Sequence, residues 1–500
     1  MTYEAWKTAP MIIPVVMCGG AGTRLWPLSR ETRPKPLLPL IEGTSTFAAT
    51  IARVGDPDLF GAPLIVANRD NRHQLAAALA EIGAEGQLLL EPEPRDTTAA
   101  IAAAAQRIAS DDPDAILLFL AADHLIKDVD GFRRSVVAAR RIAAGGAIVT
   151  FGIRPTYPAT GYGYIARGRP VPGGEGAFEV AAFVEKPDPA TAEGYVAAGH
   201  LWNSGNFMMP ASLALTELAA HAPDILAAVA TAVEDAAIEP DGAAILAGSF
   251  RATRKISFDH AVMERTSRAV VVEADFDWSD LGTWGAVWDA AEKDGERNVV
   301  QGEATLVAAS GNYVSTDRPA IGIVGVDDLV VVASDDVVLV APRSRSDSVK
   351  ALVSAMKLKP ATMAGDRARH YRPWGWYQSI DRGPAHQVKR IVVSPGQRLS
   401  LQKHRHRSEH WTIVEGVAEV TVDGRTLSLG PDESVHIPLG AVHRAANPGA
   451  EPVTLIEVQC GTYLGEDDII RLEDDYGRLA PSSDTAAGTV DVPSSVPSRA

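Results

Sequence analysis

The pattern of hydrophobic residues changes along the chain, and this change limits what the chain can fold into. Up to about residue 290, short apolar runs alternate with alanine-rich stretches of helical length. Continuous apolar strands between helices are typical of an α/β layer with a mainly parallel sheet. We expect a helix over 97–109 with Asp96 as its N-cap. The runs expected as buried strands are 11–17, 63–67, 115–120 and 147–151.

After residue 290 the chain becomes rich in β-type patterns. Short Val-rich segments separated by Gly-Asn and Asp-Asp pairs predict a small β-rich connector. Further on, apolar and polar residues alternate, and an Asp423-Gly424 pair predicts a tight hairpin. The expected domains are an α/β domain over 1–292, the connector over 293–346, a helix and linker over 347–370, an all-β domain over 371–478, and a disordered tail over 479–500.

Composition excludes some classes of function. The net charge of −16 argues against a protein that coats nucleic acid, because binding to phosphate backbones requires a basic surface. A small phosphorylated substrate remains compatible with this charge, since a few local Arg, Lys and metal charges can hold it. The two cysteines, Cys18 and Cys460, and the absence of a signal peptide or membrane span favour a cytoplasmic protein.

A glycine loop follows the first expected strand directly, and glycines let backbone N–H groups approach phosphate oxygens. The loop is not a Walker A motif, because no Gly-Lys-Ser/Thr ends it, and the dinucleotide fingerprint lacks its third glycine. It suits a nucleoside triphosphate whose α-phosphorus is attacked while pyrophosphate departs, with cations that neutralise the phosphates. The loop residues are Gly19, Gly20, Gly22, Thr23 and Arg24, and Lys35 follows in an Arg-Pro-Lys-Pro run.

Two aspartates are candidate ligands for the magnesium ion that such a reaction needs. Asp123 follows the expected strand 115–120, and ligands bind at strand C-termini in open α/β sheets. Asp280, in Asp-Trp-Ser-Asp, is the second candidate. An aspartate after a strand is more often a helix cap, so the interpretation depends on the whole ordered set of motifs. That set also contains Gly-Tyr-Gly-Tyr at 161–164, Val-Glu-Lys-Pro at 184–187 and Trp-Asn-Ser-Gly at 202–205.

Metal-ligating residue types crowd into residues 402–410. On a strand, alternate residues point to one side, so Gln402, His404 and His406 can share a face. Glu409 follows, and a distant Pro-x-Gly-x-x-His motif ends at His443, which together resemble the two-part signature of a cupin β-barrel. Such clusters suit Zn²⁺ or another divalent first-row metal, whereas the alternative is a solvated basic strand. Two ligand sets remain open: Gln402, His404, Glu409 and His443, or the same set with His406 in place of Gln402.

From about residue 12 to 478, these motifs resemble the bacterial bifunctional mannose-1-phosphate guanylyltransferases, which also carry phosphomannose isomerase activity. The resemblance implies a Rossmann-like nucleotidyltransferase domain that uses Mg²⁺ to transfer GMP from GTP to mannose-1-phosphate. It implies a cupin domain that interconverts fructose-6-phosphate and mannose-6-phosphate. Asp259 with residues 261–264, and residues 25–30 and 371–375, match the family as well.

The resemblance also implies roles for individual residues. Triphosphate binding falls to the 19–24 loop and Lys35, metal binding to Asp123 and Asp280, and base binding to the region of Arg95. That region reads Arg-Asp-Thr-Thr-Ala-Ala, which departs from the family's Arg-Asn-Thr-Ala-Pro-Ala, so it supports nucleotidyl transfer more than the choice of guanine. The implied sugar contacts are Gly163, Glu185, Lys186 and Asn203.

Isomerisation moves a proton between C1 and C2, which requires a base and a means of stabilising an oxyanion. We expect Glu409 and His410 to take part in catalysis. Arg398, Arg407 or Lys389 would bind the sugar phosphate, and Arg398 is preferred because it lies in the loop before the ligand strand. An alternative is a monofunctional guanylyltransferase whose cupin only binds or regulates. A homodimer is compatible with the sequence.

Overall fold

The computed structural model describes residues 11–20, 22–30, 33–239, 241–334, 337–357 and 369–476. The chain divides into two compact units, residues 1–365 and 366–500, and each is described by itself. The predicted tail over 479–500 and the linker residues 358–368 lie outside the described residues. Within the ranges just given, no helix combines the length and the apolar character that crossing a membrane requires.

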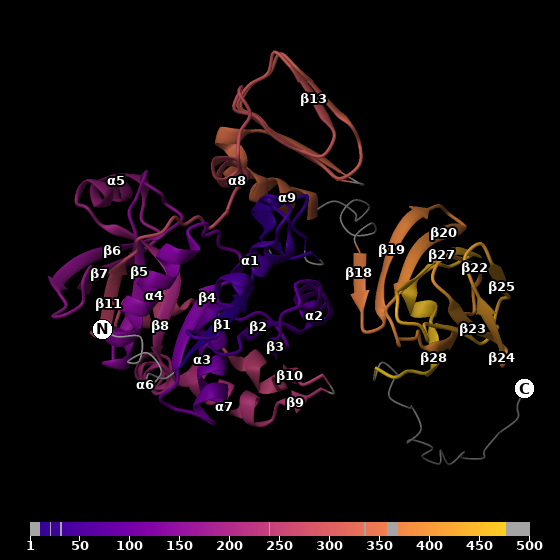
Figure 1. The fold of residues 1–500 in the computed structure, drawn as a ribbon, viewed down its shortest axis with the longest axis horizontal. Helices are drawn as coiled ribbons and strands as arrows, with labels where there is room; N and C mark the ends of the chain where they lie inside the picture. Colours follow the sequence, from indigo (N-terminus) through magenta and orange to yellow (C-terminus); the bar gives the residue numbers. More distant parts are fainter. Residues whose placement is uncertain are drawn as a thin grey trace, which may run out of the picture. The chain divides into compact units, whose positions relative to one another are not determined.

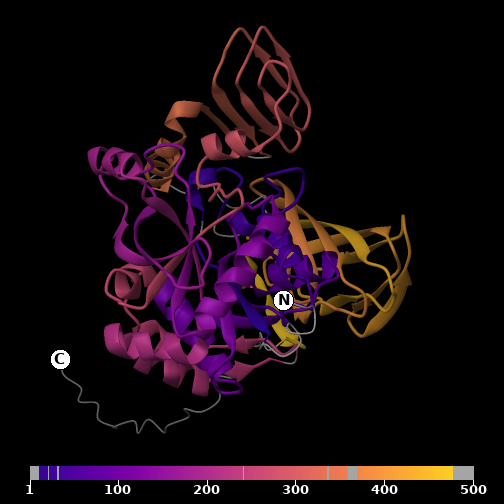
Figure 2. The same cartoon turned by 60° about the vertical axis from the view of Figure 1, so that its left-hand side comes forward.

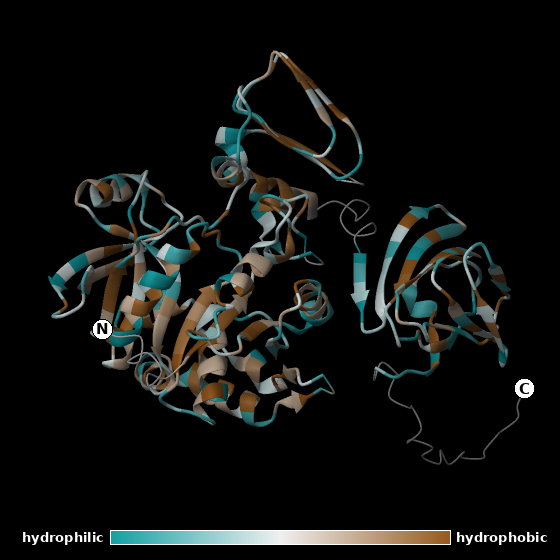
Figure 3. Cartoon of the chain, viewed as in Figure 1, coloured by the Kyte–Doolittle hydropathy of each residue, from teal (hydrophilic) through white to brown (hydrophobic). Residues whose placement is uncertain are grey.

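The first unit is built on a sheet of eleven strands in the order β5-β11-β7-β6-β8-β4-β1-β2-β3-β10-β9 (Figure 1). Its central strands are almost fully buried and carry the hydrophobic residues drawn brown in Figure 3. The strands are β1 (Ile12–Cys18), β2 (Leu64–Asn68), β3 (Gln87–Glu91), β4 (Ile116–Ala121), β5 (Ile148–Ile153), β6 (Gly163–Pro170), β7 (Ala177–Glu185), β8 (Leu201–Pro210), β9 (Ala237–Ile238), β10 (Ala244–Ile245) and β11 (Ala269–Glu273).

The predicted fold class is confirmed, but the sheet is mixed rather than mainly parallel. Five adjacent strands run parallel to one another: β4, β1, β2, β3 and β10. In contrast, β8 is antiparallel to β4, β5 and β6, and β7 is antiparallel to β6 and β11. The cause lies partly in the short connection between β6 and β7, where Gly173 and Gly176 have positive φ, because a tight turn joins antiparallel strands.

Helices cover both faces of this sheet. Helices α3, α6 and α7 pack on one face, and seven consecutive buried alanines or isoleucines of α3 allow close approach to its neighbours. The N-cap prediction was wrong, because Arg95 occupies the N-cap position and Asp96 is the first helical residue, with φ 61°. The helices are α1 (Thr46–Arg53), α2 (Arg72–Glu81), α3 (Asp96–Ala109), α4 (Val129–Ala144), α5 (Pro189–Ala197), α6 (Ala211–His221), α7 (Pro223–Glu234) and α8 (Trp284–Ala290).

The β-rich segment forms a coil of stacked short strands, visible as a separate stack in both views (Figures 1 and 2). Strands β12, β14 and β16 pair in parallel, as do β13 and β15. The coil shares a hydrophobic core with the segment after the glycine loop, where Tyr313 and Val330 pack with Leu25 and Leu38. The elements are β12 (Val299–Gln301), β13 (Ala304–Val307), β14 (Tyr313–Thr316), β15 (Ile321–Val324), β16 (Leu329–Ala333), β17 (Val338–Pro342) and α9 (Val349–Lys357).

The second unit consists of two antiparallel sheets, β18-β19-β20-β27-β22-β25 and β24-β23-β26-β21-β28, which share one hydrophobic core. The predicted hairpin is confirmed, since Asp423 and Gly424 have positive φ between β23 and β24. The strands are β18 (Arg369–Arg372), β19 (Gly375–Arg382), β20 (His386–Val393), β21 (Leu401–Lys403), β22 (Arg407–Glu415), β23 (Ala418–Val422), β24 (Arg425–Leu429), β25 (Ser434–Ile437), β26 (His443–Ala446), β27 (Val453–Gly461) and β28 (Ile470–Glu473).

Candidate functional site

Lys35 connects three segments at the C-terminal edge of the parallel strands. Its side chain is buried, and Nζ donates to Asp123 Oδ2 at 2.8 Å and to the backbone carbonyl of Asp280. Gly22 has φ 56°, and a Cβ there would lie only 2.5 Å from the Cβ of Lys35. The structure therefore brings together the glycine loop, the lysine and both predicted metal-binding aspartates.

The carboxylate of Asp123 is held in its ionised form. Burial by itself would raise the pKa of Asp123, but the ammonium of Lys35 and the ring of His124 outweigh this and lower it. Asp280 is fixed as well, because its Oδ1 accepts from the Tyr162 hydroxyl at 2.8 Å and from the Gly282 amide at 3.0 Å. Carboxylate oxygens are hard ligands that suit Mg²⁺, and the contacts of Lys35 bring the segments of Asp123 and Asp280 together.

The glycine loop faces open space. Gly19 and Gly20 are exposed, Gly20 has φ 90°, and a Cβ at either position would meet nothing within 4 Å among the described residues. Thr23 and Arg24 lie in the following 3-10 turn η2 (Thr23–Leu25), where Arg24 is exposed. The loop thus has room for a ligand in front of its backbone, next to the buried cation of Lys35.

A buried carboxyl group at the end of β3 was not singled out from the sequence. The Glu91 side chain is buried, and its Oε1 has no hydrogen-bond partner in the part of the chain that the structure describes. Burial, with a contribution from Asp96, raises the pKa of Glu91 to about 7. The predicted Arg95 lies nearby in sequence and donates to Glu93 at 3.2 Å. An acidic residue that ends the apolar run 88–90 was the signal available in the sequence.

Strands β6, β7 and β8 bring together the four residues expected to contact a sugar. Gly163 pairs in register with Glu185, and a Cβ at Gly163 would lie 2.5 Å from Glu185 Oε2. Lys186 Nζ lies 2.6 Å from Glu185 Oε1. Asn203 Nδ2 donates at 2.8 Å to Asp259 Oδ1, a residue to which the sequence motifs assigned no role.

Tyr162 connects two groups of residues: the metal-type cluster (Lys35, Asp123 and Asp280) and the sugar-type cluster (Gly163, Glu185, Lys186, Asn203 and Asp259). Its hydroxyl donates to Asp280, and the next residue is Gly163 of the sugar-type cluster. The Tyr162 ring lies edge-on to Trp202 and Trp278, with centroids 5.1 Å and 5.2 Å away. Both clusters therefore belong to one site in the first unit.

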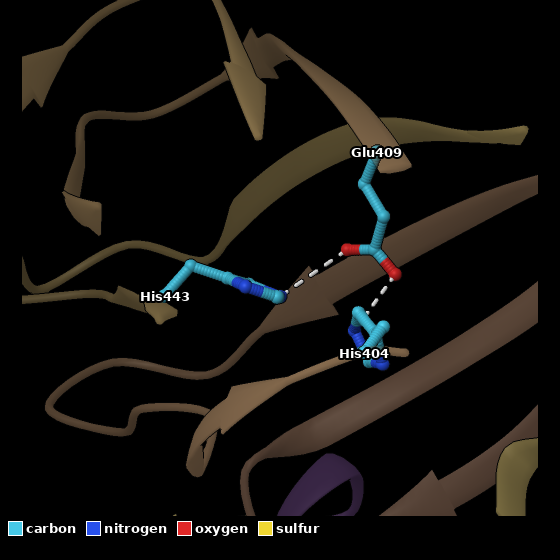
Figure 4. A group of neighbouring side chains, drawn as sticks. All are labelled: His404, Glu409 and His443. Carbon is cyan, nitrogen blue, oxygen red and sulfur yellow. Dashed lines mark ion pairs between the residues drawn. The ribbon is translucent and has the colours of Figure 1, made fainter. Parts of the chain in front are cut away.

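In the second unit, three side chains converge around one point (Figure 4). Glu409 lies between two imidazoles, with Oε1 3.0 Å from His404 Nε2 and Oε2 3.4 Å from His443 Nε2. All three are buried, and they come from the chain after β21, from β22 and from β26. Burial by itself would raise the pKa of Glu409, but the two histidines hold it well below its usual value.

The protonation pattern of this triad fits a bound metal ion. The His443 Nδ1–H donates to the carbonyl of Ala441 at 3.0 Å, so in the neutral ring the Nε2 lone pair faces the carboxylate of Glu409. Two acceptors that face each other are satisfied by a cation between them, either a proton on the imidazole or a metal ion. The Nδ1 of the buried His404 has no hydrogen-bond partner among the described residues, and its Nε2 is close to Glu409 Oε1 without hydrogen-bond geometry, which also suits ligation.

Gln402, the fourth predicted ligand, lies beside the triad, whereas His406, the alternative to it, does not. Gln402 is buried and pairs in register with His443, so both side chains lie on one face of the sheet. The His406 ring is 52% exposed and its Nδ1 lies 2.8 Å from Asp468 Oδ1. The strand ends at Lys403, so the alternation that would have placed His406 with His404 is broken there.

Two residues predicted to act in catalysis point elsewhere. His410 is exposed and stacks on His436 with ring centroids 4.4 Å apart, because alternation along β22 turns it outward when Glu409 points inward. Arg398, which the sequence favoured for phosphate binding, forms a surface ion pair with Asp475 at 2.6 Å. Neither residue lines the cavity beside the triad, so the geometry does not support either assignment.

Lys389 and Arg407, which were expected after Arg398 as candidates for binding the sugar phosphate, line a cavity beside the triad. Arg407 Nε lies 3.1 Å from Glu409 Oε1, and Gln459 Nε2 donates both to Glu409 at 3.1 Å and to Glu457 at 2.9 Å. Burial, together with the charge of Glu409, raises the pKa of Glu457 to about 8. The charged residues that line the cavity are Arg372, Lys389, Arg407, Glu457, Glu466 and Arg471.

The chain matches three protein-family models that together span most of its length. These are Nucleotidyl transferase over residues 13–297, MannoseP isomerase/GMP-like beta-helix domain over 294–356, and Mannose-6-phosphate isomerase C-terminal over 362–474.

Known proteins match over almost the full chain. Xanthan biosynthesis protein XanB of Xanthomonas campestris pv. campestris (strain B100) is 46% identical over 469 residues, which cover 93% of this chain and 99% of that protein. Mannose-1-phosphate guanylyltransferase of Escherichia coli (strain K12) is 44% identical over 476 residues, covering 94% and 99%. A solved structure described as mannose-1-phosphate geranyltransferase from Thermus thermophilus is 33% identical with TM-score 0.61, covering 69% of this chain and 99% of that chain.

After loading with Zn²⁺ and dialysis, the His443→Ala protein is expected to retain much less metal than the unaltered protein. The change deletes one ligand and leaves Glu409 buried with a single imidazole partner. The matched control is His406→Ala, which alters a half-exposed ring outside the triad and is expected to retain zinc. Metal content measured by atomic emission checks this, and equal zinc in His443→Ala and the unaltered protein would contradict it.

Proposed function

Because the chain belongs to the family of mannose-1-phosphate guanylyltransferases that carry a C-terminal mannose-6-phosphate isomerase domain, we propose that its two sites serve that family's two reactions. The N-terminal domain transfers GMP from GTP to mannose-1-phosphate, which yields GDP-mannose and pyrophosphate. The C-terminal cupin domain isomerises mannose-6-phosphate. The relative named for xanthan biosynthesis indicates that the GDP-mannose supplies polysaccharide synthesis.

The convergence of Lys35, Asp123 and Asp280 carries the assignment of the transferase site. A phosphate oxygen of mannose-1-phosphate attacks the α-phosphorus of GTP, so the protein has no nucleophile to provide and must neutralise charge. Lys35 and Arg24 supply positive charge, and the backbone at Gly19, Gly20 and Gly22 approaches the phosphates. Mg²⁺, which Asp123 and Asp280 would hold, adds charge neutralisation on the departing pyrophosphate.

We assign base recognition to Glu91. It ends β3, two strands from β1 in the same sheet, which is about 10 Å from the glycine loop and matches the span from phosphates to base. The Watson–Crick edge of guanine presents two N–H donors, and a carboxylate offers two acceptors. Adenine presents an acceptor there, so Glu91 would favour GTP over ATP.

Asp123→Asn is expected to lower nucleotidyl transfer by at least about 100-fold. The substitution removes the negative charge that pairs with Lys35 and would hold Mg²⁺. Pyrophosphate release from GTP and mannose-1-phosphate provides the measurement, and isomerase activity of the same variant provides the control. Equal loss of both activities would count against separate sites.

The efficiency kcat/KM for GTP is expected to depend on pH through Glu91. Since the pKa of Glu91 is raised to about 7, the carboxyl becomes neutral as the pH falls through 7 and loses one of its two acceptors. We expect kcat/KM for GTP to fall by about tenfold per pH unit below that point. In Glu91→Gln this dependence should flatten, apart from the titration of GTP itself. The same pH profile in both proteins would exclude the assignment.

The isomerase site would hold Zn²⁺ or another divalent first-row metal through Gln402, His404, Glu409 and His443, and such a metal stabilises negative charge on a sugar oxygen. The product of isomerisation that we propose is fructose-6-phosphate, in exchange with mannose-6-phosphate. Lys389 and Arg407, with Arg372 and Arg471, line the adjacent cavity and bind the sugar phosphate.

Glu457 is our candidate for the base that moves the proton between C1 and C2. It lines the cavity, and Gln459 and Trp411 both donate to it and to the metal-ligating Glu409. These shared donors fix its carboxyl group next to the proposed metal. A pKa raised to about 8 lies near working pH, where a group can both take and return a proton.

Glu457→Gln is expected to abolish isomerisation while leaving zinc content and nucleotidyl transfer unchanged. The amide preserves shape and still accepts from Trp411 or Gln459, but it cannot take up a proton. Incubation with mannose-6-phosphate in deuterated water measures both turnover and C2 proton exchange. Retained exchange in this variant would rule Glu457 out as the base.

Binding of mannose-6-phosphate by the cupin domain without turnover would instead support a purely regulatory cupin.

For the cellular setting, we propose a cytoplasmic enzyme, in keeping with the free Cys18 and Cys460. We also propose a homodimer, since Val307 and Val324 are paired neighbours on β13 and β15 and are 55% and 72% exposed, a surface that a second copy can cover.

A further inference from the structure

Asp259 lies at the sugar-type cluster in a position that its neighbours determine closely. It starts the five-residue π-helical turn η6 (Asp259–Met263), a rare conformation that occurs often at functional sites. The Asn203 amide that contacts it has only one possible orientation. Asn203 Oδ1 accepts from Thr150 Oγ1 at 2.9 Å and from the Gly205 amide at 3.1 Å, so Nδ2 must donate to Asp259 Oδ1.

The charges around Asp259 do not favour a structural role. Its carboxylate is close enough to Glu185 for the two to repel each other, and Lys186, which pairs with Glu185, offsets only part of this repulsion. Burial and this repulsion raise the pKa of Asp259 to about 6, although its side chain remains partly exposed. An ionised carboxylate here therefore costs stability, and a neutral Asn would keep the bond from Asn203.

We infer that Asp259 is a sugar-binding residue that works with Glu185, the two carboxylates accepting hydrogen bonds from hydroxyl groups of the hexose phosphate. This inference rests on the proposed function, which places the sugar at Glu185 and Asn203. Carboxylates only accept, and sugar hydroxyls donate, so two neighbouring carboxylates suit a polyhydroxylated ligand. Gly163 leaves the space into which Glu185 turns, because a Cβ there would collide with its carboxylate.

The test compares Asp259→Asn with the unaltered enzyme in full-length form. We expect KM for mannose-1-phosphate to rise about tenfold or more, KM for GTP to stay unchanged, and the melting temperature to stay equal or rise. The matched control is Glu264→Gln, which neutralises a carboxylate at the other end of η6 that pairs with His260. It is expected to leave both KM values unchanged.

Deoxy analogues of mannose-1-phosphate, altered at C2, C3, C4 or C6 in turn, identify the hydroxyl. For the analogue that lacks the contacted hydroxyl, Asp259→Asn should cause little further loss, since the interaction is already absent. An unchanged KM for mannose-1-phosphate, or a lowered melting temperature with KM for GTP raised equally, would overturn the inference. Failure of the proposed function is distinguishable, because the unaltered enzyme would then release no pyrophosphate with mannose-1-phosphate.

Discussion

A buried ammonium is costly unless charged and polar partners surround it, and Lys35 meets this requirement at one point only, between Asp123 and the carbonyl of Asp280. These partners come from the end of β4 and from the segment before α8, and the second of them lies 245 residues further along the chain than Lys35. One lysine therefore holds three distant segments together. The glycine loop passes against the same side chain at Gly22. The glycine loop and the segments that carry Asp123 and Asp280 are therefore arranged around this cation.

The second site depends on the same principle with the signs reversed. Glu409 is a fully buried anion, and two imidazoles and Arg407 surround its carboxylate. The lone pair of His443 Nε2 faces this anion because Nδ1–H is engaged by Ala441. Such an arrangement is most stable with a metal cation at its centre. Since the two sites share no residue, each reaction can be lost without the other.

Features set by local periodicity were predictable from the sequence. Apolar runs located the buried strands to within one or two residues, and the Asp-Gly pair located a hairpin, because these signals depend on neighbours along the chain. The antiparallel half of the sheet and the parallel coil depend on which distant strands pair, which periodicity does not specify. Strand alternation was a poor guide at His406, because the strand ends before this residue. Applied correctly along the next strand, the same alternation predicts that His410 points outward.

The order of the motifs along the chain led to Lys35 and Asp123 as residues of the first site and to His443 as a residue of the second. In each site, the structure brings these residues together with other predicted site residues. Glu91 and Glu457 were missed because an isolated acidic residue looks the same in sequence whether it is solvated or buried. Asp259 was recognised as part of a family motif, but the motif alone gave it no role. Arg398 was preferred from its position before the ligand strand, and only the fold shows its pairing with Asp475.

We expect the cluster around Lys35 to bind GTP and to transfer its nucleotidyl group to mannose-1-phosphate. Pyrophosphate release from mannose-1-phosphate with each of the four nucleoside triphosphates tests it directly in the presence of Mg²⁺. We expect rapid release with GTP and at least about tenfold slower release with the other three. Equal rates with all four, or no release with GTP, would contradict the claim.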